Sequence, residues 1–184
     1  HALHHQVFVD EKARGVFTGD TFGISYREFD VEGRAFIMPT TTPSQFDPEQ
    51  LLASIDRVLV LRPDHVYLTH YSRVSDVARL GEELKAAIGA YVEIALRHAE
   101  AVDAAAVIAE ELMRYTSESL DRHGDRSTGE LRRRLLEPDM RLNADGLLAW
   151  VRRPTGVAPG ACLWPLLAQG LGGLALAVHW LRQP

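Results

Sequence analysis

Two hydrophobic patterns divide the chain, and the first, up to residue 73, is a series of short strands around one helix. Residues 6–10 and 16–18 each have the pattern of a strand, and Gly15 between them is free to take a positive φ. These residues predict a β-hairpin. A third apolar run, residues 66–68, predicts a strand that leads to His70.

The helix in this part is predicted by its start signals and its apolar stripe. Asp47 is a favourable N-cap, and Pro48 suits the first turn. Apolar side chains then recur every three or four positions, at Leu51, Leu52, Ile55, Val58 and Leu59. The order strand, loop, helix, strand predicts an α/β fold, in which ligands gather at the carboxyl ends of strands.

The loop between hairpin and helix, residues 20–47, has neither the period of a strand nor that of a helix. A loop of this length in a compact domain is usually either functional or a sign that an element has been misassigned. This one begins at a carboxylate, Asp20, so we expect it to take part in the function.

After Ser75 the pattern becomes helical. Two apolar stripes are predicted, Val77, Leu80, Leu84, Ile88, Tyr91 and Ala95 in the first, and Val102, Ala106, Ala109, Leu112 and Met113 in the second. Gly124 is expected to end the second helix. Ser127 is expected to cap a short helix through Leu136, and Asn143 another, while residues 132–134, all arginine, predict a solvated face.

The last segment is a linker, residues 154–160, followed by an apolar run from Cys162 to Leu181. Twenty residues just reach across a bilayer as a helix, but Pro165 and three glycines weaken that interpretation. We expect a buried tail or an oligomer contact rather than a membrane anchor.

Charge and cysteine content exclude some functions. The net charge is −5, which argues against nucleic acid as a partner, since phosphate binding needs clustered Lys and Arg. A lone cysteine excludes an intrachain disulfide and a Cys-rich zinc site, and it suits a cytoplasmic location. The chain starts at His1 rather than Met, so we expect it to be a fragment.

Histidines and one aspartate form the candidate chemistry. His1 lies in the first residues, whereas Asp20 and His70 follow predicted strands. Imidazole and carboxylate are both zinc ligands, and a catalytic zinc keeps one position open for water. A histidine at a strand end is more often structural, so the chemistry alone leaves both readings open.

The motifs add a resemblance. His1-Ala2-Leu3-His4-His5, then residues 17–21 (Phe-Thr-Gly-Asp-Thr), then residues 68–71 (Leu-Thr-His-Tyr) resemble the second half of a metallo-β-lactamase-fold hydrolase. Asp20, where the true β-lactamases carry Cys, is similar to the glyoxalase II and general hydrolase branch. The resemblance covers residues 1–73, and the family's first motif, His-x-His-x-Asp-His, is missing.

The resemblance implies the C-terminal half of an αββα sandwich in residues 1–73, followed by a helical appendage in 74–153 and the tail in 154–184. It implies two zinc ions in the complete protein, with His1 and His70 each ligating one and Asp20 bridging both and acting in catalysis. It also implies attack by water or hydroxide on an ester, a thioester or a related bond of a small molecule. With half of the ligands missing, we expect this chain to hold metal weakly or singly.

Other polar residues near these positions are candidates for supporting the ligands or contacting substrate. They are His4, His5, Thr21, Tyr26, Arg27, Thr40, Thr41, Tyr71 and Arg73. For the loop residues a hydrogen bond within the loop is the simpler role, and Arg27 can pair locally with Glu28 or Asp30.

Two alternatives remain open at this level. In the first, the chain is a non-catalytic remnant whose helical region or tail mediates interaction or homo-oligomerisation. In the second, it is an oxidoreductase on the same fold that uses iron, since His and Asp ligate iron as well as zinc.

Overall fold

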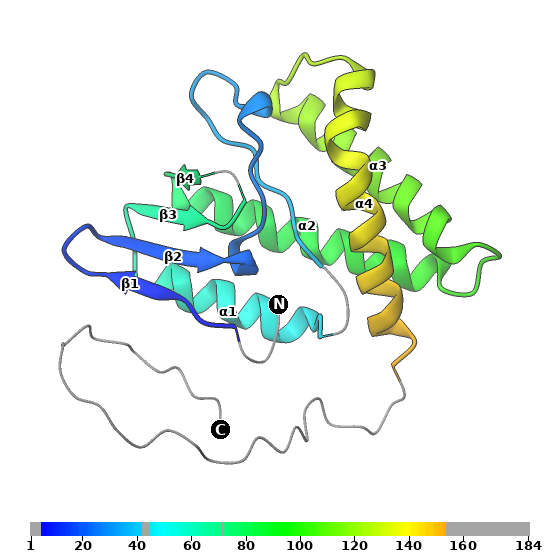
Figure 1. Ribbon diagram of the computed structural model, residues 1–184, viewed down its shortest axis with the longest axis horizontal. Coiled ribbons are helices and arrows are strands. Elements are labelled where there is room, and N and C mark those ends of the chain that lie inside the picture. The colour runs from blue at the N-terminus through cyan, green and yellow to red at the C-terminus, as the bar shows by residue number, and fades with distance from the viewer. Residues whose placement is uncertain (1–4, 42–44, 71, 154–184) are drawn as a thin grey trace.

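The protein has a mixed α/β fold, with a small sheet at one side and long helices at the other (Figure 1). The computed structural model describes residues 5–41, 45–70 and 72–153. The buried side chains of the strands and of all four α-helices form one continuous core.

The sheet has four strands in the order β1-β2-β3-β4. Strands β1 (Phe8–Asp10) and β2 (Gly15–Gly19) form the predicted antiparallel hairpin, whereas β2 and β3 (His65–Leu68) are parallel neighbours. Strand β4 (Ser72–Val74) returns antiparallel to β3. The carboxyl ends of β2 and β3, the two central strands, therefore lie side by side at one end of the sheet.

The conformation predicted for the hairpin turn was wrong in one respect. Arg14, not Gly15, has the positive φ, of 48°. Gly15 instead leaves room for the Tyr67 ring on the neighbouring strand, since a Cβ there would lie 2.8 Å from Cε2 of Tyr67.

The crossover from β2 to β3 runs through two short 3₁₀ helices, η1 (Asp20–Phe22) and η2 (Arg27–Phe29), and then α1 (Pro48–Val60). The helix begins as predicted, because the Asp47 carboxylate accepts a hydrogen bond from the Gln50 amide at 3.0 Å. The loop is irregular as predicted, and a bridge between Ile24 and Met38 ties its two arms together.

Helices α2 (Val77–His98) and α3 (Ala104–His123) follow. All six predicted stripe residues of α2 are buried, and Gly124 ends α3 with a φ of 97°, as predicted. The stripe predicted for α3 was partly wrong, since Val102 precedes the helix and is 94% exposed, and Ala106 is exposed. Leu112 and Met113 are buried as predicted, and the other buried positions of α3 are Ala104, Ile108, Thr116 and Leu120.

One helix, α4 (Gly129–Val151), stands where two were predicted. Its N-cap is Thr128, not Ser127, and Pro138 lies inside it. Pro138 is exposed, and so is Arg134, whose carbonyl loses its helical partner to the proline, so water can satisfy that group. Asn143 is no cap but a buried side chain within the helix.

The prediction of a solvated arginine face was wrong for Arg132, which is 8% exposed. Its guanidinium donates to Asp125 at 2.8 Å and to Asp121 at 2.8 Å, and these bonds join the start of α4 to the end of α3. Arg133 and Arg134 are exposed as predicted.

The two faces of the sheet differ. Val16, Val66, Leu68 and Val74 point into the core that the sheet shares with α1 and α2. The opposite face carries aromatic side chains, with Phe17 47% exposed, Phe8 56% exposed, and the Phe17 ring stacked on Tyr67 at 4.5 Å.

In the part of the chain that the structure describes, no helix combines the length and the apolar character needed to cross a membrane. The apolar run 162–181 lies outside the described residues.

Candidate functional site

The candidate site is built on the adjoining ends of β2 and β3. The Thr18 hydroxyl donates to the Tyr67 carbonyl at 3.3 Å, and the Thr69 amide donates to the Gly19 carbonyl at 3.5 Å. Gly19 has a φ of 53°, which turns the chain out of β2 and places Asp20 at the start of η1. The polar residues that follow the two strands are thus held side by side.

Asp20 and His70 come together at this edge. Nε2 of His70 lies 3.4 Å from Oδ1 of Asp20. The His70 side chain is 50% exposed and the Asp20 side chain 27% exposed, whereas the Asp20 Oδ1 atom itself is buried. Of the three residues predicted to ligate metal, these are the two that the structure describes, and it brings them together.

The distance between these two atoms fits a shared metal ion. Two ligands of a tetrahedral zinc, each about 2.1 Å from the ion, lie about 3.4 Å apart. Among residues 5–41, 45–70 and 72–153, however, no group of three or more His, Cys, Asp or Glu side chains is arranged to hold a metal. The described residues therefore fit part of a metal site and do not complete one.

His5 lies beside these ligand candidates. Its Nε2 donates to the Thr18 carbonyl at 2.9 Å, and a Cβ on Gly19 would lie 2.4 Å from its Cε1. The imidazole thus packs against the backbone from which Asp20 projects. A histidine in this position supports the end of β2.

Asp139 on α4 was not predicted, and it lies near the same place. The Tyr26 hydroxyl donates to its Oδ2 at 2.7 Å. Burial raises the pKa of Asp139, while the bond from Tyr26 and the nearby charge of His70 lower it. The sequence shows Asp139 only as one acidic residue after Pro138, and nothing local links it to a loop 113 residues earlier.

We expect Tyr26→Phe to raise the pKa of Asp139 further, because it removes the hydrogen bond that stabilises the carboxylate. A carboxyl group whose pKa is raised in the folded state stabilises the protein below its unfolded pKa, and that contribution is lost as pH rises through the folded pKa. The variant should therefore lose more stability at pH 7, about 1–2 kcal/mol, than at pH 4. Carbon-13 NMR titration of Asp139 and urea unfolding at both pH values measure the two effects.

Tyr115→Phe is the control, since the Tyr115 hydroxyl forms no hydrogen bond with the described residues. An unchanged Asp139 titration in Tyr26→Phe would contradict the prediction.

The other predicted side chains are spread over several roles. Thr21 and Thr40 are buried, and the Thr41 hydroxyl and amide bind Asn143, with amide N to Oδ1 at 2.7 Å. Arg27 donates to Ser25 and pairs with Asp30 at 3.2 Å, one of the local partners predicted. Arg73 is exposed and stands opposite Tyr67 in the sheet.

Asn143 fixes the loop to α4. Its Oδ1 accepts from Thr41, and its Nδ2 donates to the Pro39 carbonyl at 3.1 Å, both in buried surroundings. This contact explains why a polar residue is buried in the helix. His1, His4 and Tyr71 lie outside the described residues.

Comparison with known proteins does not assign the chain to a family. The sequence matches no protein-family profile, and neither a curated protein nor a solved structure matches the chain significantly.

Proposed function

We propose that this chain is part of a metal-dependent hydrolase of the metallo-β-lactamase superfamily, with zinc as the metal. The observation that carries the proposal is the 3.4 Å approach of His70 Nε2 to Asp20 Oδ1 at the adjoining ends of two parallel strands. The order of the motifs around His1, Asp20 and His70 supports it. The substrate is a small molecule with an ester, thioester or related bond.

In this proposal Asp20 and His70 would hold one metal ion, and His1 would ligate a second in the complete protein. A bound divalent metal lowers the pKa of water to about 7 and so supplies a nucleophile at neutral pH. His5 keeps the Thr18 carbonyl, and with it the strand end, in place. The half-exposed His70 leaves the substrate an approach from solvent, and hydrolysis then breaks the C–O or C–S bond to give an acid and an alcohol or thiol.

The open face of the sheet supports the αββα sandwich that the family implies. Contiguous exposed aromatic surface marks an interaction surface, and Phe8, Phe17 and Tyr67 lie on the side away from α1 and α2. A second sheet packed there would bury them. The lone cysteine of the sequence supports a cytoplasmic location.

Zinc binding by the 184-residue chain tests the proposal. We expect at most one weakly bound zinc per chain, because the described ligands are incomplete. Asp20→Ala and His70→Ala should each weaken binding at least about tenfold, since even the loss of a residue that only orients a ligand costs about 10–100-fold. Competition with a chromophoric chelator, together with elemental analysis after dialysis, measures affinity and stoichiometry.

The matched control is His65→Ala. His65 lies at the opposite end of the same strand and bonds to Ser75 Oγ at 3.0 Å, so its loss should leave zinc affinity unchanged. If His65→Ala weakened binding as much as His70→Ala, zinc would bind nonspecifically and the proposal would fail. Two zinc ions per chain would contradict the expected occupancy.

Hydrolysis is tested on a complete protein of the kind that the proposal implies, one that also carries the His-x-His-x-Asp-His motif. Generic ester and thioester substrates should be cleaved, and Asp20→Ala should abolish the cleavage. Oxygen consumption by the iron-loaded protein without ester hydrolysis would favour the oxidoreductase instead, and absence of any metal binding would favour an interaction module.

A further inference from the structure

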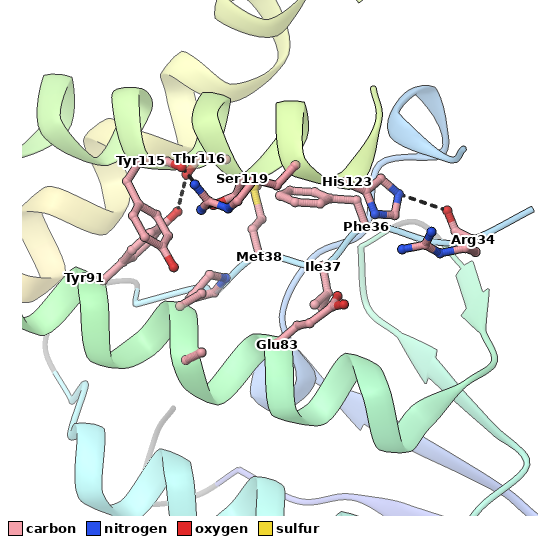
Figure 2. Close-up of a pocket in the computed structure, with 14 residues that line it drawn as sticks. Arg34, Phe36, Ile37, Met38, Glu83, Tyr91, Tyr115, Thr116, Ser119 and His123 are labelled. Atoms are coloured by element: carbon pink, nitrogen blue, oxygen red, sulfur yellow. Dashed lines mark hydrogen bonds between the residues drawn. The ribbon is translucent and has the colours of Figure 1, made fainter. Parts of the chain in front are cut away.

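A cavity lies between α2, α3 and the loop segment 34–39, away from the strand ends (Figure 2). Its volume is about 250 Å³, and Asp20, Tyr26, His70 and Asp139 are not among the residues that line it. Pockets for drug-sized ligands measure roughly 300–1,000 Å³. This cavity therefore suits a ligand with one ring or a short acyl chain.

One end of the cavity is aromatic and apolar. The rings of Tyr91 and Tyr115 meet edge to face, with centroids 5.9 Å apart, whereas Met38 and Phe36 of the loop line the cavity farther along, with Phe36 beside His123 (Figure 2). The Tyr91 hydroxyl already shares a hydrogen bond with Thr116 Oγ1 at 2.8 Å. This end offers an apolar surface rather than an unfilled hydrogen-bonding group.

The remaining walls carry an excess of positive charge. Arg34 and Arg122 both line the cavity and are exposed. Within the described residues, neither guanidinium has a carboxylate at ion-pair distance, and the bond from Arg122 goes to the neutral Ser119 hydroxyl at 2.8 Å. Glu83, the acidic residue of the lining, accepts a bond from Arg79 at 2.8 Å, which offsets its charge.

We infer that this cavity binds a small amphipathic carboxylate, whose apolar part contacts Tyr115 and whose carboxylate pairs with Arg122, while Arg34 adds positive charge at the other end. Guanidinium groups bind carboxylates through paired, charge-assisted hydrogen bonds. The apolar end and the unpaired cations together require a ligand with both features. The inference does not depend on the proposed hydrolase function, because the cavity and the strand ends share none of the residues named for either.

Isothermal titration of the whole chain with three eight-carbon probes tests the inference. Octanoate carries the carboxylate, octanol is neutral, and octylammonium carries the opposite charge. We expect one octanoate per chain, bound at least about tenfold more tightly than octanol, the scale of one charge-assisted hydrogen bond. Octylammonium should bind more weakly than octanol.

Two variants assign the binding to the cavity. Arg122→Gln should weaken octanoate about tenfold and leave octanol unchanged, because only the carboxylate contact is lost. Ala86→Leu adds bulk at an exposed lining position of α2 and should weaken both probes. Arg114→Gln is the control, since Arg114 lies on α3 like Arg122 but pairs with Glu111 and Glu118 and does not line the cavity.

The inference is overturned if octanol binds as tightly as octanoate, if Arg122→Gln binds octanoate like the wild type, or if the folded wild-type chain binds none of the three probes. Circular dichroism of each variant verifies that the fold is kept. Asp20→Ala should bind octanoate normally, which separates this result from a failure of the zinc prediction.

Discussion

Gly23→Ala should destabilise the protein by about 4 kcal/mol, the sum of backbone strain and overpacking. Gly23 has φ 75° and ψ −160°, a conformation that is almost confined to glycine. A Cβ there would lie 2.3 Å from the Met38 carbonyl oxygen, which also accepts the Ile24 amide at 2.9 Å. The added methyl group must therefore separate the two arms of the loop just after η1.

Gly33→Ala is the matched control for this change. Gly33 also has a positive φ, of 76°, but a Cβ there would meet no atom within 4 Å. Gly33→Ala should therefore lower the free energy of unfolding only by the strain of a positive φ in a residue with a Cβ, about 1 kcal/mol. Urea unfolding of the two variants separates strain from collision, and equal losses would show that the contact with Met38 is not what requires glycine.

Asp125→Ala should lower the free energy of unfolding by about 3 kcal/mol at neutral pH. The reason is that the buried Arg132 then loses one of its two carboxylate partners. The Asp125 carboxylate accepts bonds from Arg132 at 2.8 Å and from the Ser127 hydroxyl at 2.5 Å, and it is 5% exposed. Asp121 remains bound to Arg132, so the loss should fall at the lower end of the range for broken buried pairs. Asp64→Ala, which breaks the exposed pair with Arg14, should leave stability unchanged.

The effect of Asp125→Ala should also depend on pH. Burial opposes ionisation of Asp125, but the bonds from Ser127 and Arg132 outweigh it and lower its pKa. A carboxyl group with a lowered folded pKa stabilises the protein above its unfolded pKa, about 3.9, and this contribution is lost as pH falls through the folded value. Urea unfolding should give a smaller difference in the free energy of unfolding between variant and wild type at pH 3 than at pH 7. An equal difference at the two pH values would contradict this prediction.

The elements predicted well from sequence are those whose signals are local. The cap and stripe of α1, the stripe of α2, and the glycine that ends α3 all lie within or next to the element they define. The meeting of Asp20 and His70 also followed from local evidence, because each residue comes directly after its strand and the strand ends of an α/β fold share an edge.

The failures occurred where distant contacts decide the structure. Pro138 and Asn143 have the local character of a break and a cap, but α4 runs through both because its buried face packs on α3 and Asn143 binds the loop at Thr41. Arg132 belongs to an arginine run, and only the acidic groups at the end of α3 explain its burial. Asp139 could not be connected with Tyr26 for the same reason.

The contacts that hold the loop have a kinetic consequence. Thr41 and Asn143 are 102 residues apart in the chain, and Tyr26 and Asp139 are 113 apart. Contacts between such distant residues must overcome a large loop-closure entropy and form slowly. We therefore expect the loop that leaves Asp20 to acquire its native conformation only after α4 has docked, so that the candidate site is among the last parts of the molecule to be completed during folding.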